Sequence, residues 1–242
     1  MRLDQAMVER GLCESRERAK RAILAGQVRV NSNLARKPSD AVSAADTVAV
    51  KAGEKFVSRG GYKLERALDA FHLDVTGLVA IDIGASTGGF TDCLLQRGAR
   101  QVFAVDVGRG QLAWKLRQDR RVVVLEKTNA RYLKPDQFPQ PFDLAVVDCS
   151  FISLRKILPP AVALLKGPGK MVALVKPQFE AGKAEADKGR GVIRDASIHE
   201  RILRELRQFT AEQQNLKWRD VVESPLEGPA GNKEFLVLIE KM

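Results

Sequence analysis

Beyond residue 63, short apolar runs alternate with segments in which apolar residues recur every three or four positions. The runs, of which Leu78–Ile83 is typical, predict buried strands, and the segments between them predict helices. We expect strands at 78–83, 101–106, 121–125, 143–148, 170–176, 217–223 and 234–240, and helices at 63–71, 89–97, 111–117, 152–165 and 197–213. Such alternation is typical of an α/β fold with a mainly parallel sheet. Because no helix separates the last two strands, we expect one antiparallel strand.

The pattern before residue 63 predicts a separate small α+β domain at 1–51. Residues 52–62 show little periodicity, which indicates a linker, and Gly60-Gly61 predicts a sharp bend within it. The second domain then spans 63–242. The elements expected in the first domain are a helix at 3–10, a helix capped by Ser15, strands at 27–30 and 47–50, and a turn at 31–33.

The two predicted domains differ in their density of net positive charge. The chain has 40 Lys+Arg against 30 Asp+Glu, a net charge of +10, and residues 1–63 carry +6 of that excess. A concentrated basic charge favours a polyanionic partner such as nucleic acid, with a solvated basic surface as the alternative.

Composition also excludes several classes of protein. Apolar runs reach about six residues, far short of a membrane span, and the N-terminus lacks a signal-peptide pattern, so we expect a cytoplasmic protein that does not enter membranes. Three scattered cysteines and two histidines argue against a metal site. Two Trp and two Tyr argue against exposed aromatic platforms for stacking RNA bases.

A glycine-rich turn follows the first strand of the second domain. Small residues there let a ligand approach the backbone, and the following helix N-terminus favours negative charge. Asp106 ends the next strand 24 residues after Asp82, where a carboxylate can accept both hydroxyls of a ribose. We therefore expect a nucleoside-containing cofactor, with a plain tight turn as the alternative. The turn comprises Asp82, Ile83, Gly84, Ala85, Ser86, Thr87, Gly88, Gly89 and Phe90.

This turn resembles the S-adenosylmethionine site of Rossmann-like methyltransferases. The resemblance implies that Gly84–Phe90 faces the methionine part and that Asp106 holds the ribose. It also implies that Thr128 and Asn129, after the third strand, lie near the adenine. Many relatives have Asp at position 129, and an Asn can also hydrogen-bond an exocyclic amine.

The first domain resembles an S4 RNA-binding domain. The resemblance rests on Arg2-Leu3-Asp4, on Ser15-Arg16 at the start of the second helix, and on the run 26–31, GQVRVN, with Ser32 in place of the usual Gly. The resemblance implies that this domain binds structured RNA mainly through contacts with the RNA backbone. The predicted RNA-binding residues are Arg2, Arg16, Arg18, Lys20, Arg21 and Arg59.

Four charged residues are expected to meet at the carboxyl edge of the sheet: Lys63, Asp148, Lys176 and Glu234. They suit methylation of a hydroxyl, which must lose its proton as it attacks the methyl group. Burial beside a second cation favours a neutral lysine, so Lys176 is the predicted base and the carboxylates orient the lysines. For each residue taken alone, an ordinary ion pair is the alternative.

Together the segments SRGGYKLERAL (58–68), DIGASTGGFTDCLLQRGA (82–99), DCSFISL (148–154), LVKPQFE (174–180) and GNKEF (231–235) resemble the TlyA family, which is similar to FtsJ-type RNA methyltransferases with a Lys-Asp-Lys-Glu tetrad. The tetrad falls on the four residues named above. The resemblance implies an enzyme that uses S-adenosylmethionine to methylate the 2′-hydroxyl of cytidine in ribosomal RNA, in the large subunit or in both subunits. We expect it to be a monomer and to need no metal.

Three other functions stay open at this point. The family also carries a haemolysin label, which would imply a membrane-active protein. A non-catalytic RNA-binding factor and a methyltransferase acting on a base or a protein are further alternatives. Residues 182–194, rich in Gly and basic residues, predict either a lid over RNA or a surface loop.

Overall fold

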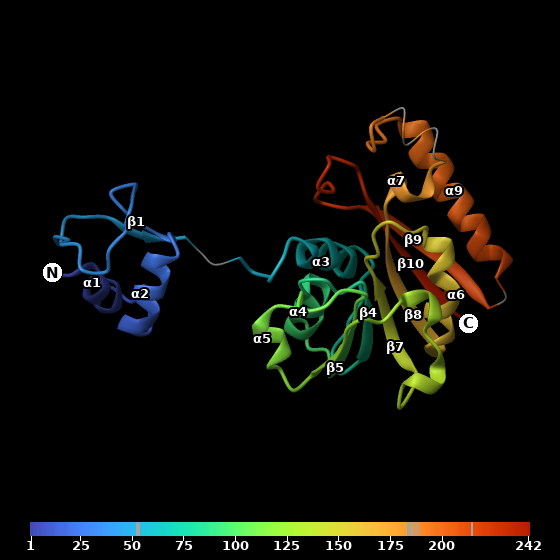
Figure 1. Ribbon diagram of the computed structural model, residues 1–242, viewed down its shortest axis with the longest axis horizontal. Helices are drawn as coiled ribbons and strands as arrows, with labels where there is room; N and C mark the ends of the chain where they lie inside the picture. The colour runs from blue at the N-terminus through green and yellow to red at the C-terminus, as the bar shows by residue number, and fades with distance from the viewer. Residues whose placement is uncertain (52–53, 183–184, 186, 188, 214) are drawn as a thin grey trace. The chain divides into compact units, whose positions relative to one another are not determined.

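The computed structural model describes residues 1–51, 54–182, 185, 187, 189–213 and 215–242, and its chain forms two compact units, Met1–Lys55 and Phe56–Met242 (Figure 1). Four residues of the predicted lid, at 183, 184, 186 and 188, lie outside the described residues.

The first unit is a small α+β structure with its own core. Helix α1 (Leu3–Glu9) and helix α2 (Arg16–Leu24) pack with a three-stranded sheet of order β2-β1-β3. The Ser15 side chain accepts a hydrogen bond from Arg18 N at 3.3 Å, so the predicted helix cap is present. The strands are β1 (Val28–Val30), β2 (Asn33–Leu34) and β3 (Val48–Val50), and the buried core is Leu3, Ala6, Met7, Ala19, Ile23, Val28, Ala35 and Val42.

The second unit contains a seven-stranded sheet of order β6-β5-β4-β7-β8-β10-β9. The strands from β6 to β8 run parallel, and β10 runs antiparallel to both of its neighbours. The predicted α/β fold with one reversed strand is therefore confirmed. The strands are β4 (Val79–Ile83), β5 (Gln101–Val105), β6 (Val122–Leu125), β7 (Phe142–Val147), β8 (Leu165–Val175), β9 (Leu216–Glu223) and β10 (Phe235–Lys241).

Helices cover both faces of this sheet (Figure 1). Helices α3 (Gly60–Ala70), α4 (Gly89–Gln96) and α5 (Trp114–Arg117) share one core, and α6 (Leu158–Ala163) and α9 (Ala196–Glu212) share the other. Strand β4 is buried along its whole length because its side chains enter the two cores alternately. The shorter elements are η1 (Ala130–Tyr132), η2 (Pro135–Gln137), η3 (Leu154–Lys156) and α7 (Pro177–Glu180).

The predicted helix at 152–165 is wrong. The chain there forms η3, then α6, and residue 165 already begins β8. Pro159 and Pro160 explain the break, because proline lacks an N–H and is tolerated only in the first turn of a helix. The apolar spacing that indicated one long helix therefore belongs to two short ones.

The predicted bend at Gly60-Gly61 is also wrong, because both residues lie in the first turn of α3. Gly61 is needed for packing: a Cβ atom there would overlap the ring of Phe56, which is 2% exposed and contacts Tyr62 edge-on at 5.1 Å. A Cβ atom at Gly60 would make only an ordinary contact with Phe90, at 3.5 Å.

The two glycines give a matched pair of variants. We expect Gly61→Ala to lower the free energy of unfolding by about 1–3 kcal/mol, because Phe56 must move out of a packed core. Gly60→Ala should leave the free energy of unfolding unchanged or raise it by up to about 1 kcal/mol, because alanine has a higher helix propensity than glycine. Denaturant melts of both variants measure the difference, and equal effects would contradict the packing role of Gly61.

Candidate active site

Two cavities lie side by side at the carboxyl edge of the sheet, beside β4. The chain adds β5 and β6 on one side of β4 and then β7 and β8 on the other, so this is the point where the strand order changes direction. The first has a volume of about 500 Å³ and the second about 450 Å³. Both are lined by Gly84, Ser86, Asp148 and Ser150. A molecule that fills the first cavity can therefore meet one that enters the second across these four residues.

The glycine-rich turn is closely packed against the end of β7. Gly84 has φ +88°, and a Cβ atom there would lie 2.6 Å from the carbonyl oxygen of Asp148. Asp106 holds the turn from the other side, since its Oδ2 accepts a hydrogen bond from Ser86 N at 2.8 Å and its Oδ1 accepts one from Gly108 N at 2.7 Å. The turn is thus fixed before any ligand binds.

The residues predicted to bind a cofactor divide between the two cavities. Gly88 is an exception: at φ +98° its missing side chain makes room for Leu112 and Leu116, so it serves packing. The first cavity is lined by Gly84, Ser86, Asp106, Thr128 and Asn129, and the second by Asp82, Gly84, Ala85, Ser86, Thr87, Gly89 and Phe90.

Asp82 is fully buried beneath the second cavity. Its Oδ2 accepts hydrogen bonds from Thr91 N at 2.9 Å and from Thr91 Oγ1 at 2.6 Å, whereas no hydrogen-bond partner for Oδ1 exists among the described residues. Burial, together with the nearby charges of Asp148 and Asp106, raises the pKa of Asp82 to about 7. An orphaned oxygen on such a group calls for a cationic or proton-donating ligand.

The four predicted catalytic residues line the second cavity as two ion pairs. Lys63 on α3 pairs with Glu234, and both are more than nine-tenths buried. Lys176 Nζ lies 2.5 Å from Asp148 Oδ1, an ion-pair contact without hydrogen-bond alignment. Each lysine thus has its own carboxylate.

Sheet topology explains why these four residues meet. Asp148 and Lys176 directly follow the adjacent parallel strands β7 and β8. Strand β10 is reversed, and Phe235 is paired with Val175, so Glu234 arrives at the same edge at the start of its strand. Three strands and the first helix of the unit therefore deliver the tetrad.

Sequence reasoning missed two residues of the site. Ser150 Oγ accepts a hydrogen bond from Lys176 Nζ at 2.8 Å. Phe151, at the mouth of the first cavity, is 89% exposed with φ +62° and lies 5.1 Å from the ring of Phe179. A positive φ is uncommon for a bulky residue, so Phe151 is an exposed aromatic held in a strained backbone. The available signal was the position of Ser150 and Phe151, two and three residues after Asp148.

In the first unit, acidic partners hold most of the predicted RNA-binding side chains. Asp4 is fully buried between Arg2 and Arg16, and the hydrogen bond from Arg2, with that from Arg16, lowers the pKa of Asp4 to about 2. Both arginines stay about half exposed. Arg18 pairs with Glu14, Lys20 pairs with Glu17, Arg21 is exposed, and Arg59 of the second unit lines the second cavity.

No helix within the described part of the chain is both long enough and apolar enough to span a membrane.

Comparison with known proteins defines the class. The family model described as FtsJ-like methyltransferase matches residues 56–241, and the S4 domain model matches residues 1–48. The chain belongs to the TlyA family of FtsJ-like methyltransferases, in which an S4 domain precedes the methyltransferase domain.

Three similar proteins support this assignment. The 16S/23S rRNA (cytidine-2′-O)-methyltransferase TlyA of Mycobacterium tuberculosis is 47% identical, over 98% of this chain and 88% of its own length. Hemolysin A of Brachyspira hyodysenteriae is 41% identical over 98% of both chains. A solved structure of a hemolysin-named protein from Streptococcus thermophilus is 45% identical, with a TM-score of 0.76 over 100% of this chain and 88% of that one.

Proposed function

We propose that this protein transfers a methyl group from S-adenosylmethionine to the 2′-hydroxyl of a cytidine in ribosomal RNA. One observation carries the proposal: two lysine–carboxylate pairs line the second cavity, which shares a wall with the first cavity, of about 500 Å³. The similarity to an rRNA (cytidine-2′-O)-methyltransferase names the acceptor.

The residues present fit S-adenosylmethionine. Asp106, at the end of β5, is placed for ribose hydroxyls, and Thr128 and Asn129 line the far part of the same cavity for the adenine. Asp82, with its orphaned Oδ1, suits the cationic amino group of the methionine part. Residues of the glycine-rich turn line both cavities beside these side chains.

When bound, S-adenosylmethionine supplies an electrophilic methyl group on a sulfonium. In its amine form Lys176 accepts the proton of the 2′-hydroxyl, and Asp148 stabilises the ammonium that results. Ser150 fixes the direction of the Lys176 Nζ group. Lys63, whose charge is compensated by Glu234, lines the same cavity and orients the acceptor. Alignment of hydroxyl and methyl supplies much of the rate enhancement.

The S4 unit is proposed to bind ribosomal RNA through phosphate contacts, with Arg2 and Arg16 held in place by the buried Asp4. Arg16→Gln should therefore raise the concentration of RNA needed for half-maximal transfer while leaving S-adenosylmethionine affinity unchanged. Loss of cofactor affinity in this variant would argue against a role confined to RNA.

The function is tested by incubating the full chain with labelled S-adenosylmethionine and purified small subunits, large subunits and naked rRNAs from a strain lacking the gene. Alkali-resistant label in RNA would identify ribose methylation and name the subunit. Absence of label from every RNA, with cofactor binding intact, would contradict the proposal.

The haemolysin name of two relatives defines the competing function. Leakage of dye from liposomes at physiological salt, caused by pure protein at concentrations that suffice for methylation, would support it. Methyl transfer without leakage would support the methyltransferase activity and argue against the membrane activity.

A further inference from the structure

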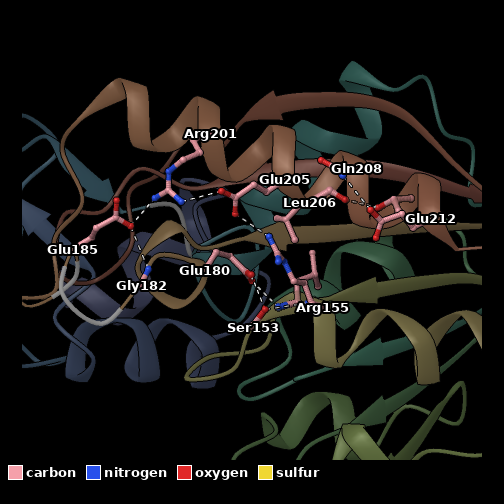
Figure 2. Close-up of polar contacts among 12 residues, drawn as sticks. Ser153, Arg155, Glu180, Gly182, Glu185, Arg201, Glu205, Leu206, Gln208 and Glu212 are labelled. Carbon is pink, nitrogen blue, oxygen red and sulfur yellow. Dashed lines mark hydrogen bonds and ion pairs between the residues drawn. The ribbon is translucent and has the colours of Figure 1, made fainter.

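Glu180 bridges the two loops that carry the Lys176–Asp148 pair (Figure 2). It is the last residue of α7, the single turn of helix that begins directly after Lys176. Its Oε2 accepts a hydrogen bond from Ser153 Oγ at 2.7 Å, and its Oε1 accepts one from Leu154 N at 2.6 Å. Both oxygens are thus engaged by the loop that follows Asp148.

This carboxylate is partly buried. Burial raises the pKa of Glu180, even though the hydrogen bonds from Leu154 and Ser153 favour its charged form. A buried carboxylate persists only where its partners are well placed. Glu180 accepts a hydrogen bond from the first N–H of η3, but this short helix also has its own N-cap, because Ser153 Oγ accepts a hydrogen bond from Arg155 N at 3.2 Å. Closing η3 alone therefore does not account for Glu180.

The two hydrogen bonds complete a ring of contacts around the base. From Lys176 the chain runs four residues to Glu180, crosses to Ser153, and returns three residues to Ser150, which contacts Lys176 Nζ at 2.8 Å. Phe179 packs on Phe151 inside the same ring. The position of the Lys176 ammonium relative to Asp148 is thus fixed from both loops.

A second set of polar contacts in the same region differs in kind. Arg155, Glu205, Arg201 and Glu185 form a series of ion pairs from η3 across α9 (Figure 2). Their side chains are 34–42% exposed. Exposed pairs of this kind contribute little to stability. Glu205 therefore provides a control: a glutamate that also contacts the η3 loop, through Arg155, but from the surface.

We propose that Glu180 is a positioning residue for methyl transfer, which holds α7 against the loop after β7 and so places Lys176 for the acceptor hydroxyl. The inference rests on the proposed function. It predicts a larger effect on the transfer step than on cofactor binding, because α7 begins directly after Lys176, whereas none of the residues that line either cavity lies on α7 itself.

The test compares three variants in single-turnover methyl transfer at saturating RNA and S-adenosylmethionine. Glu180→Met keeps the size of the side chain but accepts no hydrogen bond, and its transfer rate should fall at least about tenfold. In Glu180→Gln the amide oxygen can accept from Leu154 N while the amide nitrogen donates to Ser153 Oγ, so the rate should stay within about threefold of wild type. Glu205→Gln should match wild type.

Cofactor affinity, measured by calorimetry, separates positioning from damage to the fold. In Glu180→Met it should change by less than about threefold while the transfer rate falls. An unchanged rate in Glu180→Met, or a Gln variant as slow as the Met variant, would overturn the inference. So would a parallel loss of cofactor affinity and rate.

Two further results keep the interpretation clear. If Glu180→Met does not fold, Ser153→Ala removes one of the two hydrogen bonds and should give an intermediate rate; an unchanged rate there would count against the clamp. If wild-type protein transfers no methyl group, the proposed function fails, whereas an active wild type with indifferent Glu180 variants rejects only this inference.

Discussion

Lys176→Ala is expected to abolish methyl transfer, with a fall in rate of at least about 10²-fold, while S-adenosylmethionine still binds. Lys176 lines only the second cavity, and its Nζ is the amine that meets Asp148 at 2.5 Å. Under the proposed function, removing Lys176 leaves the hydroxyl without a proton acceptor, whereas the residues proposed to hold the ribose and adenine line the first cavity and are unchanged. The measurement is single-turnover transfer together with calorimetric binding of the cofactor.

Lys170→Ala is the matched control, because Lys170 is an exposed residue in the middle of β8, the strand that Lys176 directly follows. It should transfer methyl groups like wild type. Activity retained in Lys176→Ala would remove this residue from the role of base and leave the two carboxylates as candidates.

Asp82→Asn is expected to separate stability from cofactor binding. The pKa of Asp82 in the folded protein is about 7, above its ordinary value of 3.8, so the folded state binds the proton more tightly than the unfolded state. The free energy of unfolding therefore falls as pH rises from about 4 to 7, and the whole penalty is present above pH 7. The shift corresponds to roughly 4 kcal/mol as an upper bound.

An asparagine keeps the two hydrogen bonds from Thr91 and carries no charge, so the ligand-free variant should be more stable at pH 8 by about 1–3 kcal/mol. At pH 5 the gain should nearly vanish. Cofactor affinity should fall by about 30-fold or more, because the variant loses the carboxylate proposed to pair with the ammonium of the methionine part. Denaturant melts at the two pH values and calorimetry measure both effects; a variant less stable than wild type at pH 8 would contradict the argument.

Much of the site could be predicted from sequence because its residues are tied to strand ends. In a parallel sheet the carboxyl ends of strands share one edge, so Asp106, Asp148 and Lys176 were placed together by counting strands alone. The tetrad needed more: Glu234 precedes its strand, and it reaches the same edge only because β10 is reversed.

What sequence could not supply is contact between irregular segments. The hydrogen bonds of Glu180 to Ser153 and Leu154 join two loops, and neither loop has a periodic pattern to predict it. Gly88 was assigned to the ligand because glycine-rich turns bind ligands, yet its missing side chain accommodates Leu112 and Leu116. Apolar spacing across 152–165 likewise concealed the break that two prolines impose.

The ion pair between Lys63 and Glu234 joins residues 171 positions apart. During synthesis on the ribosome, α3 emerges long before β10. The Lys63 ammonium can therefore pair with Glu234 only when nearly the whole second unit has been made. A nascent chain that lacks β10 would have to leave this cation in water and the neighbouring core open, since a buried unpaired charge is strongly destabilising. The candidate active site is therefore among the last parts of the molecule to be completed during synthesis, and a chain that ends before β10 should lack it.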